Sequence, residues 1–370
     1  MSSGLILDFH GVRGSLSCDD PSVLEELRKD FEWFISKDFR HPGLDPGSRL
    51  SLDPGFRRDD GSIGLRRNDE GGGDSSLEFS VELHLEEPPA SLKPKGRALL
   101  RRPLFSAYEQ GCVREVDYEG KALAALDFRS ERGTIYCAEP ALLRELGYLL
   151  VLSRAGHRLD LRGLHRVHAL GIERGGKGVL VLLPSGGGKS ALCLRLLASG
   201  AARLLSEDTP LVSRNGTLHP FPLRIGTRPD EDLSHVPAQH VRSFVRRVHG
   251  EKKLVDLDFF RGQLAQGPLR SCLVVDARRC GLARSEYSFA CPLRSAFALA
   301  APLLAGWGTP QLLEYALRTD IRGMAGLAFV GASRAAAMVS LCVRSRSAVL
   351  RMSEDPQESS EALCRLIDSV

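Results

Sequence analysis

Residues 178–197, GVLVLLPSGGGKSALCLRLL, join an apolar run, a glycine-rich turn and a lysine-serine pair. Successive glycines let backbone N–H groups converge on one point, and the start of a helix adds the positive end of its dipole. Such a loop suits a triphosphate, with Lys189 on the β- and γ-phosphates and the Ser190 hydroxyl on Mg²⁺. We therefore predict a strand, a phosphate-binding loop and a helix over 178–197. The ATP-binding residues that we expect are Ser185, Gly186, Gly187, Gly188, Lys189, Ser190 and Ala191.

One position departs from the general pattern GxxxxGK[ST], because Leu183 stands where that pattern has its first glycine. The second half of the pattern, SGGGKS, is complete, and a strand before it and a helix after it are the context that the pattern requires. The alternative is a glycine-rich turn that ends in Lys-Ser without binding a nucleotide.

An acidic pair follows the expected helix, in the segment LLSEDTP at 204–210. In a parallel sheet, the carboxyl end of a neighbouring strand lies at the same crevice as the phosphate-binding loop. Glu207 and Asp208 are therefore candidates to hold Mg²⁺ together with Ser190 and to accept a proton from an attacking hydroxyl. The alternative is a helix cap or a solvated turn.

Two further groups of side chains are weaker candidates. The histidines of LHRVHALG, His165 and His168, precede the loop, but a third metal donor is missing nearby, and packed, hydrogen-bonded histidines are the common case. The second group is a basic stretch that could neutralise a transferred phosphoryl group or form a solvated helix face. It comprises Arg242, Arg246, Arg247, His249, Lys252 and Lys253.

Elements of two kinds must position these residues. In the first part of the chain we predict strands at 5–9, 77–85, 112–118, 122–128 and 133–137, forming an antiparallel sheet, and helices near 20–34 and 140–155. In the second part we predict strands at 178–183, 203–205, 269–275 and 348–352, and helices at 189–199, 294–305, 309–318 and 356–368, with 335–343 ambiguous. The predicted division is an α+β domain at 1–138 and a larger α/β domain at 139–370. Within the first domain, the segment 41–74 is Gly-, Asp-, Arg- and Ser-rich and is expected to be a disordered insertion.

Composition excludes several classes of protein. The net charge is +4 over 370 residues and the basic residues are scattered, so we expect no nucleic-acid partner. No run approaches the roughly 18–20 apolar residues of a membrane span, the best candidate being 298–307, and the first residues do not resemble a secretory signal. Nine cysteines without a CxxC pair favour reduced, buried thiols. We expect a cytoplasmic protein without a membrane partner, and leave homo-oligomerisation open.

The segment from His168 to Val212, with the loop SGGGKS and the pair Glu207-Asp208, resembles the catalytic core of HPr kinase/phosphorylase. That family has a His, a strand, a loop ending SGxGKS, a helix, and then an Asp-Asp pair. This chain is most similar to the diverged members of the family that phosphorylate a serine of lasso precursor peptides. The features that carry this similarity are the acidic pair, HPFPLRIG at 219–226, and the C-terminal strand with MSEDPQES. The phosphorylase signature Glu-x-Arg-Gly has no counterpart here.

The resemblance implies an α/β fold with a P-loop domain of the HPr kinase and phosphoenolpyruvate carboxykinase type, and a smaller α+β domain before it. It implies transfer of the γ-phosphoryl group of ATP to a serine of a peptide or protein, with Asp208 or Glu207 as base and metal ligand. It also implies a catalytic role for His168, as a residue that supports the acidic pair or the substrate. Two rival functions stay open: an ATPase or switch module without covalent modification, and a kinase of a small alcohol.

Overall fold

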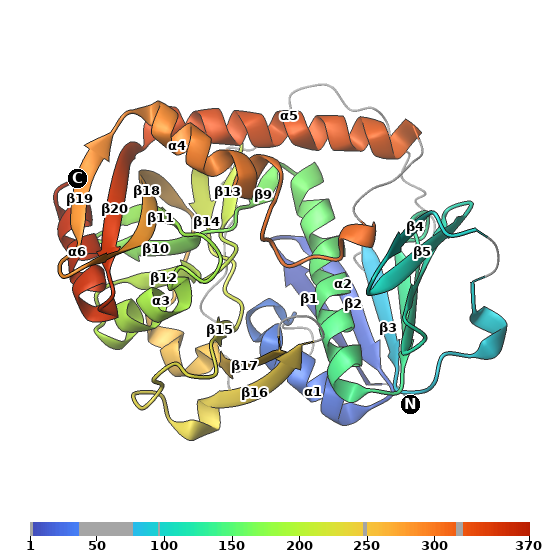
Figure 1. Cartoon of the computed structure of the whole chain (residues 1–370). Coiled ribbons are helices and arrows are strands. Elements are labelled where there is room, and N and C mark those ends of the chain that lie inside the picture. Colours follow the sequence, from blue (N-terminus) through green and yellow to red (C-terminus); the bar gives the residue numbers. More distant parts are fainter. Residues whose placement is uncertain (1–2, 37–76, 95–96, 247–249, 316–320) are drawn as a thin grey trace.

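The chain has a mixed α/β fold, as predicted. The computed structural model describes residues 3–36, 77–94, 97–246, 250–315 and 321–370, so the insertion predicted at 41–74 lies outside the described residues. Within these described residues the strands form three sheets, of eight, nine and three strands, with helices packed against the two larger ones (Figure 1).

The eight-stranded sheet is built by the first part of the chain in the order β1-β2-β3-β8-β7-β6-β5-β4. Its strands are β1 (Ser3–Phe9), β2 (Val12–Cys18), β3 (Phe79–His84), β4 (Leu100–Arg102), β5 (Phe105–Gln110), β6 (Val113–Tyr118), β7 (Ala122–Asp127) and β8 (Arg132–Cys137). The prediction of a purely antiparallel sheet is wrong, because β3 pairs in parallel with both β2 and β8. Strand alternation shows which face of a strand is buried and says nothing about the direction of its neighbour.

Two helices cover this sheet, α1 (Pro21–Asp30) and α2 (Pro140–Leu161). Helix α1 begins as predicted, with Pro21 in the first turn and the Asp20 carboxylate accepting a hydrogen bond from the Val23 N–H at 2.9 Å. Helix α2 runs beyond its predicted end at 155, and its leucines join β1, β2, β3, β7 and β8 in one apolar core.

The nine-stranded sheet carries the glycine-rich loop. Its main path is β12-β10-β11-β18, with β20 and then β19 beyond β18, while β14, β13 and β9 branch from the start of β18. The strands are β9 (Leu164–Arg166), β10 (Leu170–Arg174), β11 (Lys177–Leu182), β12 (Arg203–Ser206), β13 (Leu211–Ser213), β14 (Thr217–His219), β18 (Leu269–Leu282), β19 (Glu286–Ala290) and β20 (Arg346–Ser353). Strand β11 pairs in parallel with β18, and β18 with β20.

Helices lie on both faces of this sheet, as the continuous apolar run of β11 predicts. Val179 and Val181 face a core formed with α3 (Lys189–Ala198) and α6 (Pro356–Asp368). Leu180 and Leu182 face a second core on the other side. That core includes α4 (Pro292–Leu299), which continues as a π-helical turn (Ala300–Leu304), and α5 (Ile321–Arg344).

Two predictions for the C-terminal region need correction. The helix predicted at 309–318 is only a 3₁₀ turn, Leu313–Tyr315, within the part that the structure describes. The ambiguous segment 335–343 belongs to α5. Within the described residues, α5 is the one helix that is long and apolar enough to cross a membrane by length and composition alone, whereas we expected no such segment. Its inner residues Ala337 and Leu341 pack in the sheet core.

A three-stranded sheet, β15 (Ile225–Thr227), β17 (Gly250–Val255) and β16 (Val241–Arg246), lies beside α1 and α3 (Figure 1). The basic stretch from Arg242 does not form the predicted helix face, because its described residues belong to the antiparallel strands β16 and β17. Arg247 and His249 are outside the described residues. The nine cysteines are free, as predicted, although Cys112, Cys280 and Cys291 are exposed and not buried.

Candidate active site

The loop between β11 and α3 is a tight turn in which two glycines have left-handed backbone angles. Gly186 and Gly188 have positive φ angles of 75° and 90°, which side-chain-bearing residues rarely adopt. The Gly187 N–H donates to the Pro184 carbonyl at 2.9 Å and closes the turn. Leu183 is buried in the core between the sheet and α3, which explains why this chain keeps an apolar residue where the general pattern has glycine.

Lys189, the first residue of α3, lies between an acid and a histidine. Its Nζ forms an ion pair with Asp208 Oδ1 and lies 3.1 Å from His168 Nε2, and His168 Nδ1 lies 3.0 Å from the same carboxylate oxygen. Burial alone would raise the pKa of Asp208, but the Lys189 ammonium and the His168 ring lower it well below its usual range. Asp208 is therefore ionised, with a third of its side chain exposed, and the structure brings these three candidate residues together.

Ser190 joins the second acid of the pair. Its Oγ lies 2.7 Å from Glu207 Oε1 and 3.0 Å from the Gly226 carbonyl. Burial raises the pKa of Glu207, and the adjacent Asp208 charge raises it further. The two acids are thus in different environments: Glu207 is buried beside the serine hydroxyl, and Asp208 is more exposed beside the lysine.

The acidic pair reaches the loop by a route that differs from the prediction. Strand β12 is not a parallel neighbour of β11; antiparallel β10 lies between them and pairs with both. Two successive antiparallel pairings leave β11 and β12 pointing the same way, so their carboxyl ends still meet at one edge. The parallel neighbour, β18, presents Asp276 level with Leu182, and this acid is paired with Arg294 at 2.6 Å.

Two cationic side chains lie at the site: Arg279, which is not among the predicted residues, and Lys252, whose role the sequence leaves undecided. Arg279, on β18, lies against Gly188, where an added Cβ would approach its Nη2 to 2.5 Å. Lys252, on β17, lies next to Gly226, where an added Cβ would be 3.3 Å from its Nζ. Burial and then Arg246 lower the pKa of Lys252, while Glu207 and Asp208 act in the opposite direction. No motif points to Arg279 in the sequence, because it follows Lys189 by 90 residues (279 minus 189) and belongs to another strand.

Other candidates have structural partners away from the loop. His165 is fully buried between Asp160 (2.8 Å) and the Ser333 hydroxyl (2.7 Å), so the two histidines of the motif separate into a packed residue and a site residue. Arg242 forms ion pairs with Glu26, Asp30 and Asp256. These contacts hold β16 against α1, and they explain the charge of Arg242 without a ligand.

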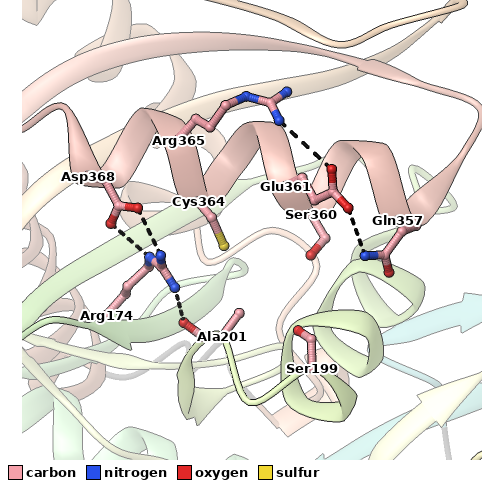
Figure 2. Close-up of a pocket in the computed structure, with 9 residues that line it drawn as sticks. All are labelled: Arg174, Ser199, Ala201, Gln357, Ser360, Glu361, Cys364, Arg365 and Asp368. Atoms are coloured by element: carbon pink, nitrogen blue, oxygen red, sulfur yellow. Dashed lines mark hydrogen bonds and ion pairs between the residues drawn. The ribbon is translucent and has the colours of Figure 1, made fainter.

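A surface hollow of about 360 Å³ lies elsewhere, between α6 and the end of α3 (Figure 2). Ser199 at its rim caps the C-terminal end of α3, about 15 Å from the loop at the N-terminal end. Its charged groups are already paired: Arg174 with Asp368 at 2.8 Å, and Glu361 with Gln357 at 3.0 Å. We therefore assign this hollow no chemistry.

The donor set around Ser190 fits Mg²⁺ better than a transition metal. Within the part of the chain that the structure describes, no group of three or more His, Cys, Asp or Glu side chains is placed to hold a metal ion. Mg²⁺ at a nucleotide needs only one or two protein oxygens besides phosphate and water. The Ser190 hydroxyl and the Glu207 carboxylate supply two such oxygens, whereas Asp208 is engaged by Lys189 and His168.

Comparison with protein-family models finds no match for this chain, and comparison with curated proteins finds none either. The fold that the structure defines is therefore a mixed α/β protein with a glycine-rich strand-loop-helix unit, and its function is argued from the site.

Proposed function

We propose that this chain is a Mg²⁺-dependent kinase that transfers the γ-phosphoryl group of ATP to a serine hydroxyl of a peptide or protein. The observation that carries the proposal is the convergence of two pairs at one loop, Lys189 with Asp208 and Ser190 with Glu207. A loop that only bound phosphate would need the lysine and the glycines, but not a second, partly exposed carboxylate beside them. The P-loop kinase fold and a lasso-type precursor peptide as substrate belong to the same proposal and rest on the resemblance above. The proposed cytoplasmic location rests on the cysteine pattern, which favours reduced thiols.

The residues divide the work as follows. Backbone N–H groups of 186–190 and the Lys189 ammonium bind the phosphates, and Arg279 adds a cation beside Gly188. Ser190 and Glu207 would hold Mg²⁺, which neutralises charge on the β- and γ-phosphate oxygens when it is bound. Asp208 would stay ionised and orient the attacking hydroxyl, and His168 would keep Asp208 and Lys189 in place.

In the transfer step, the serine oxygen forms a bond to the γ-phosphorus while the bond from that phosphorus to the β,γ-bridging oxygen breaks. ADP leaves with the electron pair, and the hydroxyl proton passes to Asp208. A loose transition state demands little from the base, so a carboxylate of low pKa is adequate if its position is right. We assign to Lys252, on β17 near the two acids, the neutralisation of charge on the transferred group.

The test is transfer of label from γ-labelled ATP to a serine-containing peptide library, with an alanine-matched library as the control substrate. Lys189→Ala and Asp208→Asn are expected to lose transfer by on the order of 100-fold or more. Lys177→Ala, a lysine at the start of β11 that bonds to the Ile367 carbonyl, is the matched control and should stay active. Phosphate release without labelled peptide would contradict the proposal and favour an ATPase, and label on a small alcohol alone would favour the other rival.

A further inference from the structure

Residues 308–315, which we call the strap, follow the π-helical turn at the end of α4. In Figure 1 the strap passes α2 and ends in a short 3₁₀ turn beside the first sheet. Its first residue lies at the candidate active site, whereas Leu312 and Tyr315 belong to the apolar core of the first sheet. The strap is therefore a direct link between the site and the N-terminal part of the chain.

The near end of the strap lies against the His168 ring. Gly308 has a φ angle of 86°, and a Cβ added to it would be 2.7 Å from both Cγ and Cδ2 of His168. Carbon atoms in ordinary contact are about 3.5–4.0 Å apart, so a side chain at this position would require a displacement of about 1 Å. The ring is itself held, because its Nδ1 lies 3.0 Å from Asp208 Oδ1 and its Nε2 lies 3.1 Å from Lys189 Nζ.

The backbone on both sides of Gly308 is fixed by hydrogen bonds. Before it, the Trp307 N–H donates to the Ala301 carbonyl at 3.0 Å. After it, the buried Thr309 hydroxyl donates to the Gly306 carbonyl at 2.7 Å. Movement of Gly308 away from the ring would break these bonds.

Arg166 joins the middle of the strap to the segment that carries His168. Its guanidinium donates to the Pro310 carbonyl at 3.0 Å and to Gln311 Oε1 at 3.2 Å. Arg166 is buried, is the last residue of β9 and precedes His168 by two residues. The strap and the histidine are thus held by the same short segment.

The far end of the strap is bonded to the first sheet and its helix. The Leu312 N–H donates to Ser153 Oγ of α2 at 2.7 Å, and the Tyr315 hydroxyl donates to the Ala124 carbonyl of β7 at 3.0 Å. Both strap residues are also buried. These contacts keep the strap from sliding along the site.

We propose that Gly308 is a positioning residue for the phosphoryl transfer: the strap holds the Gly308 backbone against His168, and His168 in turn holds Lys189 and Asp208. The kinetic consequence of this inference rests on the proposed kinase function. The position of the ring does not, and it can be tested without activity.

Gly308→Ala tests the contact, and Gly176→Ala is the matched control. Gly176, in the turn between β10 and β11, has a φ angle of 75°, and no atom of the described residues lies within 4 Å of a Cβ added there. Both variants place a side chain on a left-handed backbone, but only Gly308→Ala pushes on His168. Gly308→Ala should lower kcat by on the order of 100-fold, the effect of a shift of about 1 Å in a catalytic geometry, and Gly176→Ala should retain the wild-type kcat.

A double-mutant cycle separates an effect through His168 from a general disturbance. In the His168→Ala background the ring is absent, so Gly308→Ala should change the remaining kcat by less than about 3-fold. Thermal melting followed by circular dichroism shows that each variant is folded.

A crystal structure of Gly308→Ala reads the position of the ring independently of activity. The His168 ring should be displaced by about 1 Å and lose its contact with Asp208 or Lys189. A ring that stays in place while the strap moves would overturn the inference, and so would equal kcat values for Gly308→Ala and Gly176→Ala or a loss of kcat that persists in the His168→Ala background. If the wild-type chain transfers no phosphoryl group, the kinase proposal fails, whereas a displaced ring still supports the positioning role of Gly308.

Discussion

Asp30, the last residue of α1, is a fully buried carboxylate that three arginines surround. It accepts hydrogen bonds from Arg144 at 2.9 Å and from Arg242 at 3.0 Å, and forms an ion pair with Arg224. Arg144 and Arg242 also contact Glu26, at 2.7 and 2.6 Å, and Arg242 contacts Asp256. Among the described residues, Asp30 is the one acid paired with Arg224, which otherwise stacks over Tyr148 at 3.8 Å.

The perturbation is Asp30→Asn, which keeps the shape of the side chain and removes its charge. Two of the arginines retain an acid, so the expected loss corresponds to one unpaired buried charge and not three, about 3–5 kcal/mol in the free energy of unfolding. If the chain unfolds as one unit, the melting temperature falls by about 4–6 °C for a protein of this length. Urea and thermal denaturation followed by circular dichroism measure both quantities.

Glu25→Gln on the same helix is the matched control. Glu25 lies 3.5 Å from Arg28 and is largely exposed, so its loss should change stability by less than about 1 kcal/mol. The double variant Asp30→Asn/Arg224→Met, which removes the unpaired charge and keeps apolar contact with Tyr148, should recover about 1 kcal/mol or more relative to Asp30→Asn. The reasoning is refuted if Asp30→Asn is as mild as Glu25→Gln, or if the double variant is the less stable of the two.

Three other predictions concern the site. Burial, and then the charge of Asp208, raise the pKa of Glu207, and the ionised form is the one that would hold Mg²⁺. Phosphoryl transfer should therefore decline as the pH falls through that raised pKa, and added Mg²⁺ should shift the decline to lower pH. A decline at low pH that does not depend on Mg²⁺ in pH-rate profiles would argue against this role of Glu207. Leu183→Gly, which restores the general loop pattern, should destabilise the fold by about 3–5 kcal/mol without tightening nucleotide binding, because the leucine side chain is buried in the core. Denaturation measures the stability and titration with nucleotide measures the binding. A variant that is as stable as the wild type and binds nucleotide more tightly would contradict this expectation. Lys252→Ala should lower kcat by on the order of 100-fold, whereas Lys253→Ala, at the next residue of β17, should have little effect. Equal kcat values for the two variants in steady-state kinetics would show that Lys252 has no part in the site.

Much of the candidate site could be predicted because its signals are local. Gly186 and Gly188 adopt positive φ angles that favour glycine in any context, and an apolar run before the loop and a helix after it belong to one continuous stretch. The start of α1 is a local signal too, since the Asp20 carboxylate accepts a backbone N–H within its own turn. For the same reason, β11, α3 and α6 agree with their predicted positions to within one or two residues.

The features that the sequence left open depend on pairing between distant segments. Nothing in 203–208 shows that β10 separates this strand from β11, or that two antiparallel pairings restore a common direction for their ends. Nor does it show that His165 is packed and His168 is in the site, a choice made by Asp160, Ser333 and Lys189 from other elements.

The glycine-rich loop, with a lysine, a serine and an acidic pair within 24 residues, can be read from the sequence alone, because backbone conformation and chain order fix those relations. Tertiary contacts establish which acid lies beside the serine and which beside the lysine, that Leu183 is a core residue, and that Arg279 and Lys252 lie next to glycines of the site. The physical reason is that burial and charge pairing are set by what packs against a residue, and those neighbours come from strands and helices far away along the chain.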